Sequence, residues 1–352
     1  MSETKQLGQT DNAGQADQLG RPLRTLRLSV TDRCNLRCEY CMPEDEYAWL
    51  PRDDILDFEE LERLVDVFTS AGVRRIRLTG GEPLLRPELT TLIRHIARRP
   101  LVEDLALTTN GVLLEDQAAA LRAAGLRRLT VSLDTLRPDR FSALTRRDEH
   151  ARVLAGLAAA AEIGFDQLKI DSVILRGVND DELVGLVEFG RRLGAEVRFI
   201  EYMDVAGATR WTPERLFSRA EMLARLGEHY GEIAKAPTEP SAPAERYRLP
   251  DGTVFGIIAS ATTPFCRACD RSRLSADGLW FLCLYGASGI NLRELIRRDA
   301  PDDELRRVIE TTWSRRADRG AEERLGVPDR RPLLSLETLR KDPHREMHTR
   351  GG

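Results

Sequence analysis

The sequence has few aromatic residues, few histidines and no long hydrophobic run. Aromatic residues make up 6% of its 352 residues, and there are five histidines. No apolar run approaches the roughly 20 residues that a membrane-spanning helix needs, so we expect no membrane partner. Residues 1–17 are polar and lack the apolar stretch of a signal peptide, and we expect residues 1–22 to form a disordered tail.

Other absences narrow the class of protein. The net charge of −4 gives no general reason to expect a nucleic-acid partner. A P-loop of the form G-x4-G-K-[ST] is missing, so any nucleotide must be held by side chains rather than by a glycine-rich phosphate cradle. The contents of 41% hydrophobic and 31% charged residues describe a soluble globular chain, long enough for one large or two ordinary domains.

The first of two cysteine groups has the spacing C-x3-C-x2-C and comprises Cys34, Cys38 and Cys41. It follows an apolar, β-favouring run over residues 26–31, which places three thiols on a loop at the carboxyl end of a strand, where α/β folds usually keep their chemistry. Thiolates favour iron–sulfur clusters, zinc or copper(I), and three of them leave one iron of a 4Fe-4S cluster open. Zinc and simple packing are the weaker alternatives, because structural zinc wants four ligands and the nearest histidine is His95.

The second cysteine group comprises Cys266, Cys269 and Cys283, with the spacing C-x2-C-x13-C. By itself it fits a zinc site, with Asp270 or a distant histidine as fourth ligand, about as well as a cluster. Beside the first group, a second 4Fe-4S cluster is favoured, with an open iron for a substrate nitrogen or oxygen. No cysteine is left over, and disulfides belong mainly to small secreted chains, so we expect a reducing, cytoplasmic setting.

Strand and helix patterns alternate along the first two thirds of the chain. We expect strands over residues 25–31, 73–79, 102–109, 128–134, 167–175 and 196–202. We expect helices over residues 57–71, 87–99, 115–124, part of 138–163, and 180–193, the first of them begun by a capping box of Asp57 and Glu60. This alternation implies parallel strands with right-handed crossovers. Six units are too few for an eight-fold barrel, so the predicted fold is α/β, a partial (β/α)6 TIM-type barrel with a lateral gap.

A proline-rich connector over residues 236–243 follows the barrel pattern. Beyond it we expect short strands over 247–249 and 254–259, the second cysteine group, and helices over 292–298 and 302–319. These elements predict a smaller C-terminal α+β domain that carries the second cluster. The expected division of the chain is a tail (1–22), a core (23–235), a C-terminal domain (236–340) and a second tail ending in Gly-Gly (341–352).

Three cations lie on or beside strands that should be apolar: Arg27, Arg77 and Lys169. Each one alone is compatible with a solvated strand edge or a salt bridge. Three charges around one barrel mouth are harder to accommodate, because an unpaired buried charge is costly. A polyphosphate would pair with all three, so the sequence predicts that the barrel mouth binds one.

Two further motifs carry a family resemblance. Residues 79–83 read Thr-Gly-Gly-Glu-Pro, and residues 271–274 read Arg-Ser-Arg-Leu directly after the C-x2-C pair. With the two cysteine groups, they resemble the GTP 3',8-cyclase family of radical S-adenosylmethionine (SAM) enzymes, which opens molybdenum cofactor biosynthesis. The resemblance runs from about Leu23 to the chain end and includes residues 28–35, 107–111, 198–204 and 351–352. The loop 205–211 is less rich in asparagine than the family pattern.

The resemblance implies a radical reaction at two 4Fe-4S clusters. The cluster of the first cysteine group would bind SAM and cleave it to a 5'-deoxyadenosyl radical, and the second cluster would bind the guanine of GTP. The radical would abstract hydrogen from C3' of the ribose, and C3' would then add to C8 of guanine. The product would be (8S)-3',8-cyclo-7,8-dihydroguanosine 5'-triphosphate, released with 5'-deoxyadenosine and methionine.

The resemblance also assigns site residues. The catalytic residues would be the first cysteine group with Arg271 and Arg273. The SAM contacts would be Tyr40, Gly81, Glu82, Ser132 and Met203. The GTP contacts would be Arg27, Arg77, Thr108, Lys169, Arg271, Ser272 and Arg273. Gly351 and Gly352 would reach into the active site. The implied partners are an external electron donor, a second copy in a homodimer, and the cyclic pyranopterin monophosphate synthase that takes the product.

Two other readings stay open at this point. One is a radical SAM peptide-maturing enzyme with an auxiliary cluster, a class that usually carries more C-terminal cysteines. The other is a non-enzymatic iron–sulfur redox sensor or a zinc-dependent nucleic-acid binder, for which the sequence offers no basic patch or recognition helix. The substrate, GTP or a peptide, separates the first alternative from the predicted function.

Overall fold

The computed structural model describes residues 15–351 and contains one continuous sheet of twelve strands. Across the sheet their order is β12-β11-β10-β1-β2-β3-β4-β5-β6-β9-β8-β7. The six strands of the repeated β/α units are β1 (Thr25–Ser29), β2 (Arg75–Thr79), β3 (Asp104–Thr109), β4 (Arg128–Ser132), β5 (Gln167–Ile174) and β6 (Glu196–Glu201). All neighbouring pairs among these six are parallel, which confirms the predicted α/β core.

The C-terminal part of the chain adds strands to both edges of this core. These strands are β7 (Ala234–Ala236), β8 (Glu245–Arg248), β9 (Val254–Ile258), β10 (Arg271–Leu274), β11 (Leu279–Phe281) and β12 (Ile290–Asn291). Strand β9 pairs parallel with β6, and β10 pairs parallel with β1. The other four strands pair antiparallel beyond them. The expected C-terminal segment is thus joined to the core by main-chain hydrogen bonds at both sheet edges.

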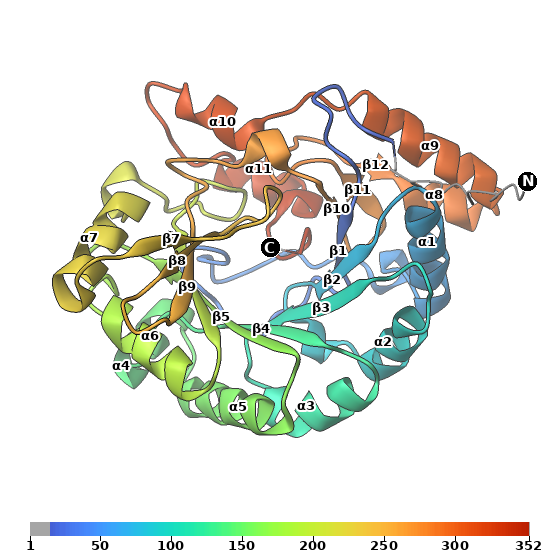
Figure 1. Ribbon diagram of the computed structural model, residues 1–352. Helices are drawn as coiled ribbons and strands as arrows, with labels where there is room; N and C mark the ends of the chain where they lie inside the picture. Colours follow the sequence, from blue (N-terminus) through green and yellow to red (C-terminus); the bar gives the residue numbers. More distant parts are fainter. Residues whose placement is uncertain (1–14, 352) are drawn as a thin grey trace, which may run out of the picture.

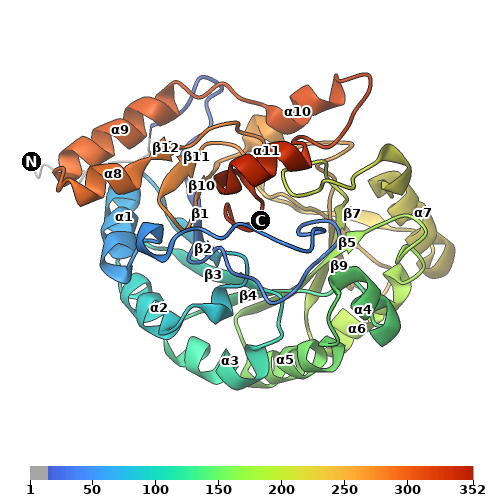
Figure 2. The ribbon, with the colours of Figure 1, turned by 180° about the vertical axis from the view of Figure 1, so that it is seen from behind.

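Helices α1, α2, α3, α5, α6 and α7 lie around the outside of the curved sheet, while α11 and the C-terminal tail that follows it lie toward the inside of the ring (Figures 1 and 2). The helices are α1 (Phe58–Ser70), α2 (Leu89–Ala97), α3 (Leu114–Ala123), α4 (Pro138–Thr145), α5 (His150–Ile163), α6 (Leu183–Arg192), α7 (Arg219–Tyr230), α8 (Leu292–Arg297), α9 (Asp302–Ser314), α10 (Gly320–Leu325) and α11 (Leu336–Lys341). The expected capping box of Asp57 and Glu60 is present at the start of α1. The helical region 138–163 is two helices, because Arg146 adopts a left-handed conformation (φ 55°) that ends α4.

Alternate side chains along each strand face either the helix-side core or the inside of the ring. Leu26 and Leu28 on β1 are fully buried against the helices, while Arg27 between them faces the inside of the ring. The same pattern repeats on β2, where Ile76 and Leu78 join the helix-side core and Arg77 faces inward. Because side chains of one strand alternate between its faces, the apolar set forms the core and the polar set lines the ring interior.

The expected disordered tail is wrong for the residues that the structure describes. Residues 1–14 lie outside that range, but Asp17 and Arg21 are buried, and Ala16 pairs with Pro22 in a β-bridge. The Arg21 Nε donates to Asp17 Oδ2 at 2.5 Å. The segment is polar but structured, because the charges of Asp17 and Arg21 are neutralised within a local ion pair. Among the described residues, no helix has the length and hydrophobicity to cross a membrane.

Candidate active site

A large cavity lies inside the ring of parallel strands. Its volume is about 850 Å³, and the inward-facing residues of β1–β6 form much of its wall. The connector between Pro237 and Ala244, the second cysteine group, Cys41 of the first group and Met347 of the C-terminal tail complete the lining. Segments that the sequence analysis assigned to different domains therefore share one cavity.

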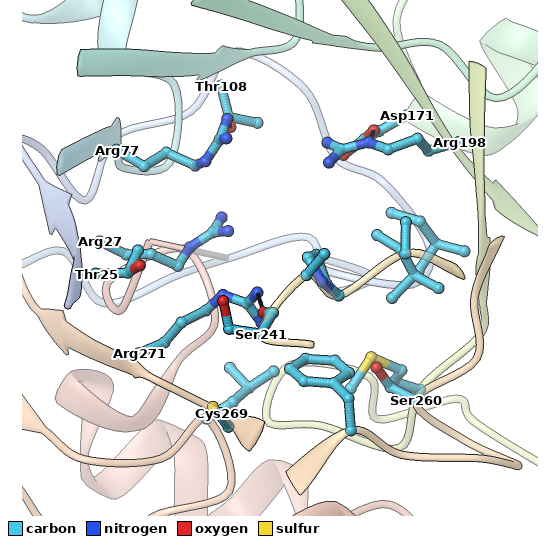
Figure 3. A pocket seen from close by; sticks show the side chains of 18 of the residues that line it. Thr25, Arg27, Arg77, Thr108, Asp171, Arg198, Ser241, Ser260, Cys269 and Arg271 are labelled. Atoms are coloured by element: carbon cyan, nitrogen blue, oxygen red, sulfur yellow. Dashed lines mark hydrogen bonds and ion pairs between the residues drawn. The ribbon is translucent and has the colours of Figure 1, made fainter. Parts of the chain in front are cut away.

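The strand register places basic residues side by side on this wall. Arg27 lies opposite Arg77 across the β1–β2 pair and opposite Arg273 across the β1–β10 pair. Arg271, two residues before Arg273, faces the same side of its strand. Figure 3 shows Arg27, Arg77 and Arg271 projecting into the cavity from one side and Arg198 from the other. The predicted gathering of cations at the barrel mouth is present.

This crowding disfavours the charged forms of the basic groups. Burial lowers the pKa of Arg27 well below its ordinary value, and the neighbouring Arg273 and Arg77 lower it further. Burial also lowers the pKa of Arg77 to about 10 and that of Lys169 to about 8. An opposite charge placed among these groups would favour their protonated forms. The cavity therefore suits a ligand with several negative charges.

Existing polar contacts hold some of these side chains in place. Arg77 Nη1 donates to the hydroxyls of Thr108 and Thr130, at 3.3 and 3.2 Å. Arg271 Nη2 donates to the Ser241 carbonyl of the connector at 2.6 Å. These contacts use neutral oxygens, so they orient the guanidinium groups without neutralising them.

Sequence reasoning missed Arg198 as a cavity residue. It lies on β6 and donates to Asp171 on β5 through Nε at 2.7 Å and Nη2 at 2.8 Å. The available signal was the one that identified Lys169, namely a cation inside an apolar strand. Its bidentate pairing with Asp171 neutralises part of the positive charge that Arg198 brings to the cavity.

The first cysteine group forms a tight loop after β1. The amides of Cys41 and Met42 donate to the Cys38 carbonyl at 3.0 and 2.7 Å. Burial raises the pKa of Cys34 to about 11, and the pKa of Cys41 is raised by burial and by the nearby Cys34. Bound iron would stabilise thiolates whose ionisation is otherwise opposed by burial. The donor set and the short loop fit the predicted 4Fe-4S cluster.

Two glycines leave the space that this loop needs. A Cβ on Gly81 would lie 2.3 Å from the Arg33 carbonyl, and a Cβ on Gly207 would lie 2.5 Å from the Cys41 carbonyl. Both distances are shorter than any side chain tolerates. Gly81 belongs to the Thr-Gly-Gly-Glu-Pro turn and Gly207 to the loop 205–211. That loop therefore packs directly on the first cysteine group, despite its departure from the family's asparagine pattern.

All three thiols of the second cysteine group belong to residues that line the same cavity as Cys41. Cys266 begins a 3-10 turn, η4 (Cys266–Ala268), and the Cys269 amide donates to the Cys266 carbonyl at 3.3 Å. Cys283 follows β11, and a Cβ on Gly320 would lie 3.0 Å from its Sγ, so glycine keeps space beside that thiol. Burial raises the pKa of Cys283 to about 12. Three thiols beside a space kept by glycine fit a second cluster.

The zinc alternative gains no support from the geometry. Within residues 15–351, no group of three or more His, Cys, Asp or Glu side chains converges on the position of one metal ion. A 4Fe-4S cluster binds each thiolate through a different iron, so its ligands stand farther apart than the ligands of one ion. The six free cysteines suit the cluster reading at both places.

Known proteins similar to this chain decide its family. The radical SAM superfamily model matches residues 28–190, and the Molybdenum Cofactor Synthesis C model matches residues 195–322. GTP 3',8-cyclase 3 of Mycobacterium bovis is 56% identical over 340 residues, which cover 96% of this chain and 90% of the relative. This chain belongs to the GTP 3',8-cyclase family. GTP 3',8-cyclase of Acidothermus cellulolyticus, 50% identical over 87% of each chain, agrees with that assignment.

Solved structures support the fold of this GTP 3',8-cyclase family member. Streptococcus suis SuiB has a TM-score of 0.58 and 18% identity, with coverage of 86% of this chain and 67% of SuiB. Another SuiB structure, bound to the precursor peptide SuiA, has a TM-score of 0.56 and covers 81% of this chain and 67% of SuiB. Likeness at this identity shows the radical SAM fold alone, so it does not favour the peptide-maturing alternative.

Three of the five expected SAM contacts line the cavity: Tyr40, Ser132 and Met203. The Tyr40 hydroxyl donates to Asp134 Oδ2 at 2.6 Å, and Asp134 also accepts from the Val173 amide at 2.8 Å. Burial raises the pKa of Asp134 to about 6. Asp134, two residues beyond the end of β4, therefore fixes the orientation of the ring that the family resemblance places over the SAM adenine.

The other two expected SAM contacts, Gly81 and Glu82, are not among the described residues that line the cavity. Glu82 is buried and accepts hydrogen bonds from the Thr109 hydroxyl and the Asn110 amide, both at 2.7 Å, and from the Leu84 amide at 2.9 Å. Burial raises its pKa to about 7. Glu82 thus holds the loop after β3, and its contact with SAM stays a prediction.

The expected GTP contacts differ in which face of their strand they occupy. Six of them line the cavity: Arg27, Arg77, Thr108, Lys169, Arg271 and Arg273. Ser272, between two of the arginines, is fully buried and is not among the lining residues that the structure describes. Its side chain points to the opposite face of β10 because side chains alternate along a strand. The expectation of a GTP contact by the Ser272 side chain does not fit this placement.

The C-terminal tail reaches the arginine row. The Gly351 carbonyl accepts from Arg27 Nε at 3.2 Å and from Arg273 Nη1 at 2.6 Å. A Cβ on Gly351 would lie 2.1 Å from Thr79 Oγ1, and its φ is +70°, so this position requires glycine twice over. The family resemblance implied that the tail enters the site; Gly351 does so, and Gly352 lies outside the described residues.

Proposed function

We propose that this chain catalyses the SAM-dependent cyclisation of GTP to (8S)-3',8-cyclo-7,8-dihydroguanosine 5'-triphosphate, the first step of molybdenum cofactor biosynthesis. One observation carries the proposal: a single cavity brings the row of buried arginines together with residues of both cysteine groups. Membership of the GTP 3',8-cyclase family supports it.

Residues of this chain would divide the binding of cofactor and substrate between the two ends of the cavity. Cys34, Cys38 and Cys41 would hold the first cluster, and Tyr40 with Ser132 and Met203 would orient SAM. When bound, the first cluster and SAM supply the 5'-deoxyadenosyl radical that takes hydrogen from C3' of the GTP ribose. The second cysteine group would hold the cluster that receives the guanine.

The arginine row would hold the triphosphate of GTP. Arg27, Arg77 and Arg273 lie in register on adjacent strands, so their separation is fixed by the sheet rather than by flexible loops. Planar guanidinium groups match phosphate oxygens with paired hydrogen bonds. A rigid anion site fixes the ribose relative to the radical source, and such positioning accounts for much of the catalytic effect in reactions of this kind.

The family resemblance extends the proposal to a cytoplasmic homodimer that takes electrons from an external donor and passes its product to cyclic pyranopterin monophosphate synthase. Light scattering on the anaerobically purified protein tests the dimer. A coupled assay with the synthase tests the transfer of product, since that enzyme would convert the cyclised nucleotide only if it is the expected one.

An anaerobic turnover assay tests the main proposal. The protein is reconstituted with iron and sulfide and supplied with reductant and SAM, and 5'-deoxyadenosine and nucleotide mass are followed with and without GTP. We expect GTP-dependent 5'-deoxyadenosine and a cyclised guanine nucleotide in equal amounts. SAM cleavage that is indifferent to GTP would point to the peptide-maturing alternative. No cleavage by protein with both clusters verified would overturn the enzymatic assignment.

A further inference from the structure

The segment before β1 closes around the second cysteine group. Asp17 to Arg21 form a tight loop in which the Asp17 amide donates to the Arg21 carbonyl and the Gly20 amide donates to the Asp17 carbonyl, both at 3.0 Å. The Trp313 indole at the end of α9 donates to the Arg21 carbonyl at 2.9 Å. The Gln18 amide donates to the Arg316 carbonyl at 3.0 Å. The loop is therefore built into the fold where α9 ends.

Two buried guanidinium groups bind the main chain of the cluster loop. Arg21 Nη1 donates to the Cys266 carbonyl at 2.9 Å, and Arg316 Nη1 donates to the Cys269 carbonyl at 2.9 Å. Arg21 is 2% exposed and Arg316 is 3% exposed. Each carbonyl belongs to one of the two closely spaced cysteines, so the two arginines together fix both ends of the η4 turn.

The charges of this network balance. Arg21 pairs with Asp17, and it donates to the Asp318 carbonyl at 2.9 Å. Arg316 pairs with the Asp318 carboxylate through Nε at 2.9 Å and stacks on Trp313, 4.5 Å from the ring centroid. The four groups Asp17, Arg21, Arg316 and Asp318 therefore contribute two positive and two negative charges beside the turn. Loss of one arginine would leave a net negative charge beside the cluster site, and loss of one aspartate charge would leave a net positive one.

We propose that Arg21 and Arg316 are positioning residues for the second iron–sulfur cluster, which fix the Cys266 and Cys269 carbonyls and set the reduction potential of the cluster. The inference rests on the proposed function in one respect, that the second cysteine group holds a cluster. Reduction adds one electron to a cluster, so a nearby positive charge favours the reduced form and a negative charge opposes it. Charge, hydrogen bonding and burial are the levers by which proteins tune such potentials.

The network predicts potential shifts of opposite sign. In the anaerobically reconstituted full chain, Arg21→Gln and Arg316→Gln should shift the second-cluster potential to more negative values and lower the iron retained per chain. Asp17→Asn should shift the potential to more positive values. Arg21→Lys and Arg316→Lys keep the charge but lose the planar fork, so their potentials should lie closer to the wild-type value than those of the Gln variants.

Redox titration followed by electron paramagnetic resonance measures these shifts. The second-cluster signal is identified by its loss in Cys269→Ser, and the signal of the first cluster, which this network does not touch, is the internal reference. The matched control is Arg315→Gln, which changes the exposed arginine next to Arg316. We expect the control to keep the wild-type potential and iron content.

The outcomes separate this inference from the proposed function. If Cys269→Ser removes no signal, the chain lacks a second cluster and the proposed function itself is wrong. If that signal exists but Arg21→Gln, Arg316→Gln and Asp17→Asn all keep the wild-type potential and iron content, the positioning role is overturned. Should a Gln variant fail to fold, the Lys variants and Asp17→Asn still decide, because unchanged potentials in all of them would contradict the proposal.

Discussion

At the residue scale, the cavity concentrates like charges on neighbouring strands. Arg27, Arg77 and Arg273 occupy one lateral row because the register of β10, β1 and β2 leaves them no other arrangement. Burial lowers the pKa of each guanidinium, and nearby arginines lower it further: Arg273 and Arg77 act on Arg27, Arg198 acts on Arg77, and Arg271 acts on Arg273. Such a row costs free energy in the empty protein and is stabilised by a polyanion. The wall is thus built for binding rather than for stability.

The substitution Arg77→Ala should weaken GTP binding selectively. A hydrogen bond to a charged group contributes about 1.5–3 kcal/mol, so we expect the KM for GTP to rise about 10- to 100-fold. Binding of SAM should change little, because Arg77 is among the expected contacts of GTP and not among those of SAM. Turnover assays at varied GTP and equilibrium dialysis with SAM measure the two effects. Arg94→Ala on the exposed face of α2 is the control, and an unchanged KM in Arg77→Ala would remove this residue from the phosphate site.

The site residues that could be predicted from the sequence have one physical property in common. Cysteine triads and cations inside apolar strands are costly without a ligand, so their presence alone indicates a site. Ser272 carried no such signal, and its side chain faces away from the cavity. Arg21 and Arg316 were missed because arginines in polar segments are ordinary on a surface. Only the folded chain shows that both are buried against cysteine carbonyls.

At the element scale, the six repeated β/α units were predictable and the sheet edges were not. Apolar runs of five to eight residues between helical patterns identify β1 to β6 from local sequence. Strands β9 and β10 are equally short, but their partners lie far away in sequence. The pairing of strands that are far apart in sequence depends on how the whole chain packs, so local sequence does not reveal it. The strands of the expected C-terminal α+β domain extend the barrel sheet, a pairing that the sequence analysis did not predict.

At Gly351 the C-terminal tail packs so closely against Thr79 that no side chain would fit. Gly351→Ala would place a Cβ 2.1 Å from Thr79 Oγ1 at a backbone angle that disfavours any side chain. We expect the tail to leave the arginine row and turnover to fall at least about 10-fold, since displacement of a positioning group by about 1 Å can cost 100-fold in rate. Global stability should change less than turnover, because the buried tail residues His348 and Arg350 precede the substituted position and can keep their own contacts.

The double variant Gly351→Ala/Thr79→Ala tests the cause. It removes the clashing hydroxyl and should restore part of the lost turnover, although the positive φ remains strained. Gly326→Ala is the matched control, because its φ is −78° and its nearest neighbour atom would lie at 3.5 Å. Full turnover in Gly351→Ala alone would show that the tail is not needed at the arginine row.

At the scale of the whole molecule, the chain ends join parts that are distant in sequence. The segment 15–22 holds the second cysteine group, and the tail residue Arg350 stacks on Phe281 of β11, 4.2 Å from the ring centroid. Near the first cysteine group, His348 packs edge-on against Tyr47 and Trp49, at centroid distances of 5.2 and 5.5 Å. The tail thus bridges the surroundings of both cysteine groups, and its docking contributes to the folded state as a whole.

This docking makes stability depend on pH through His348. The side chain is 2% exposed, and within the described part of the chain neither ring nitrogen has a hydrogen-bond partner. Burial lowers the pKa of His348 to about 3, and the nearby Arg37 lowers it further. Below its ordinary pKa of 6.5, the unfolded chain binds a proton that the folded chain does not. Stability from this group is therefore full above that pH and is lost progressively as the pH falls from 6.5 toward 3.

The substitution His348→Phe keeps an aromatic ring and removes the titration. Between pH 7 and pH 5, the wild-type protein should lose about 2 kcal/mol of stability relative to the variant. Thermal unfolding of the cluster-loaded proteins at both pH values should show this as a difference of a few degrees that appears only at pH 5. The control His229→Phe, at an exposed position on α7, should follow the wild type. If His348→Phe and the wild type lose stability in parallel between pH 7 and pH 5, then His348 takes up no proton on unfolding. Its side chain would then not be held in the neutral form in the folded protein.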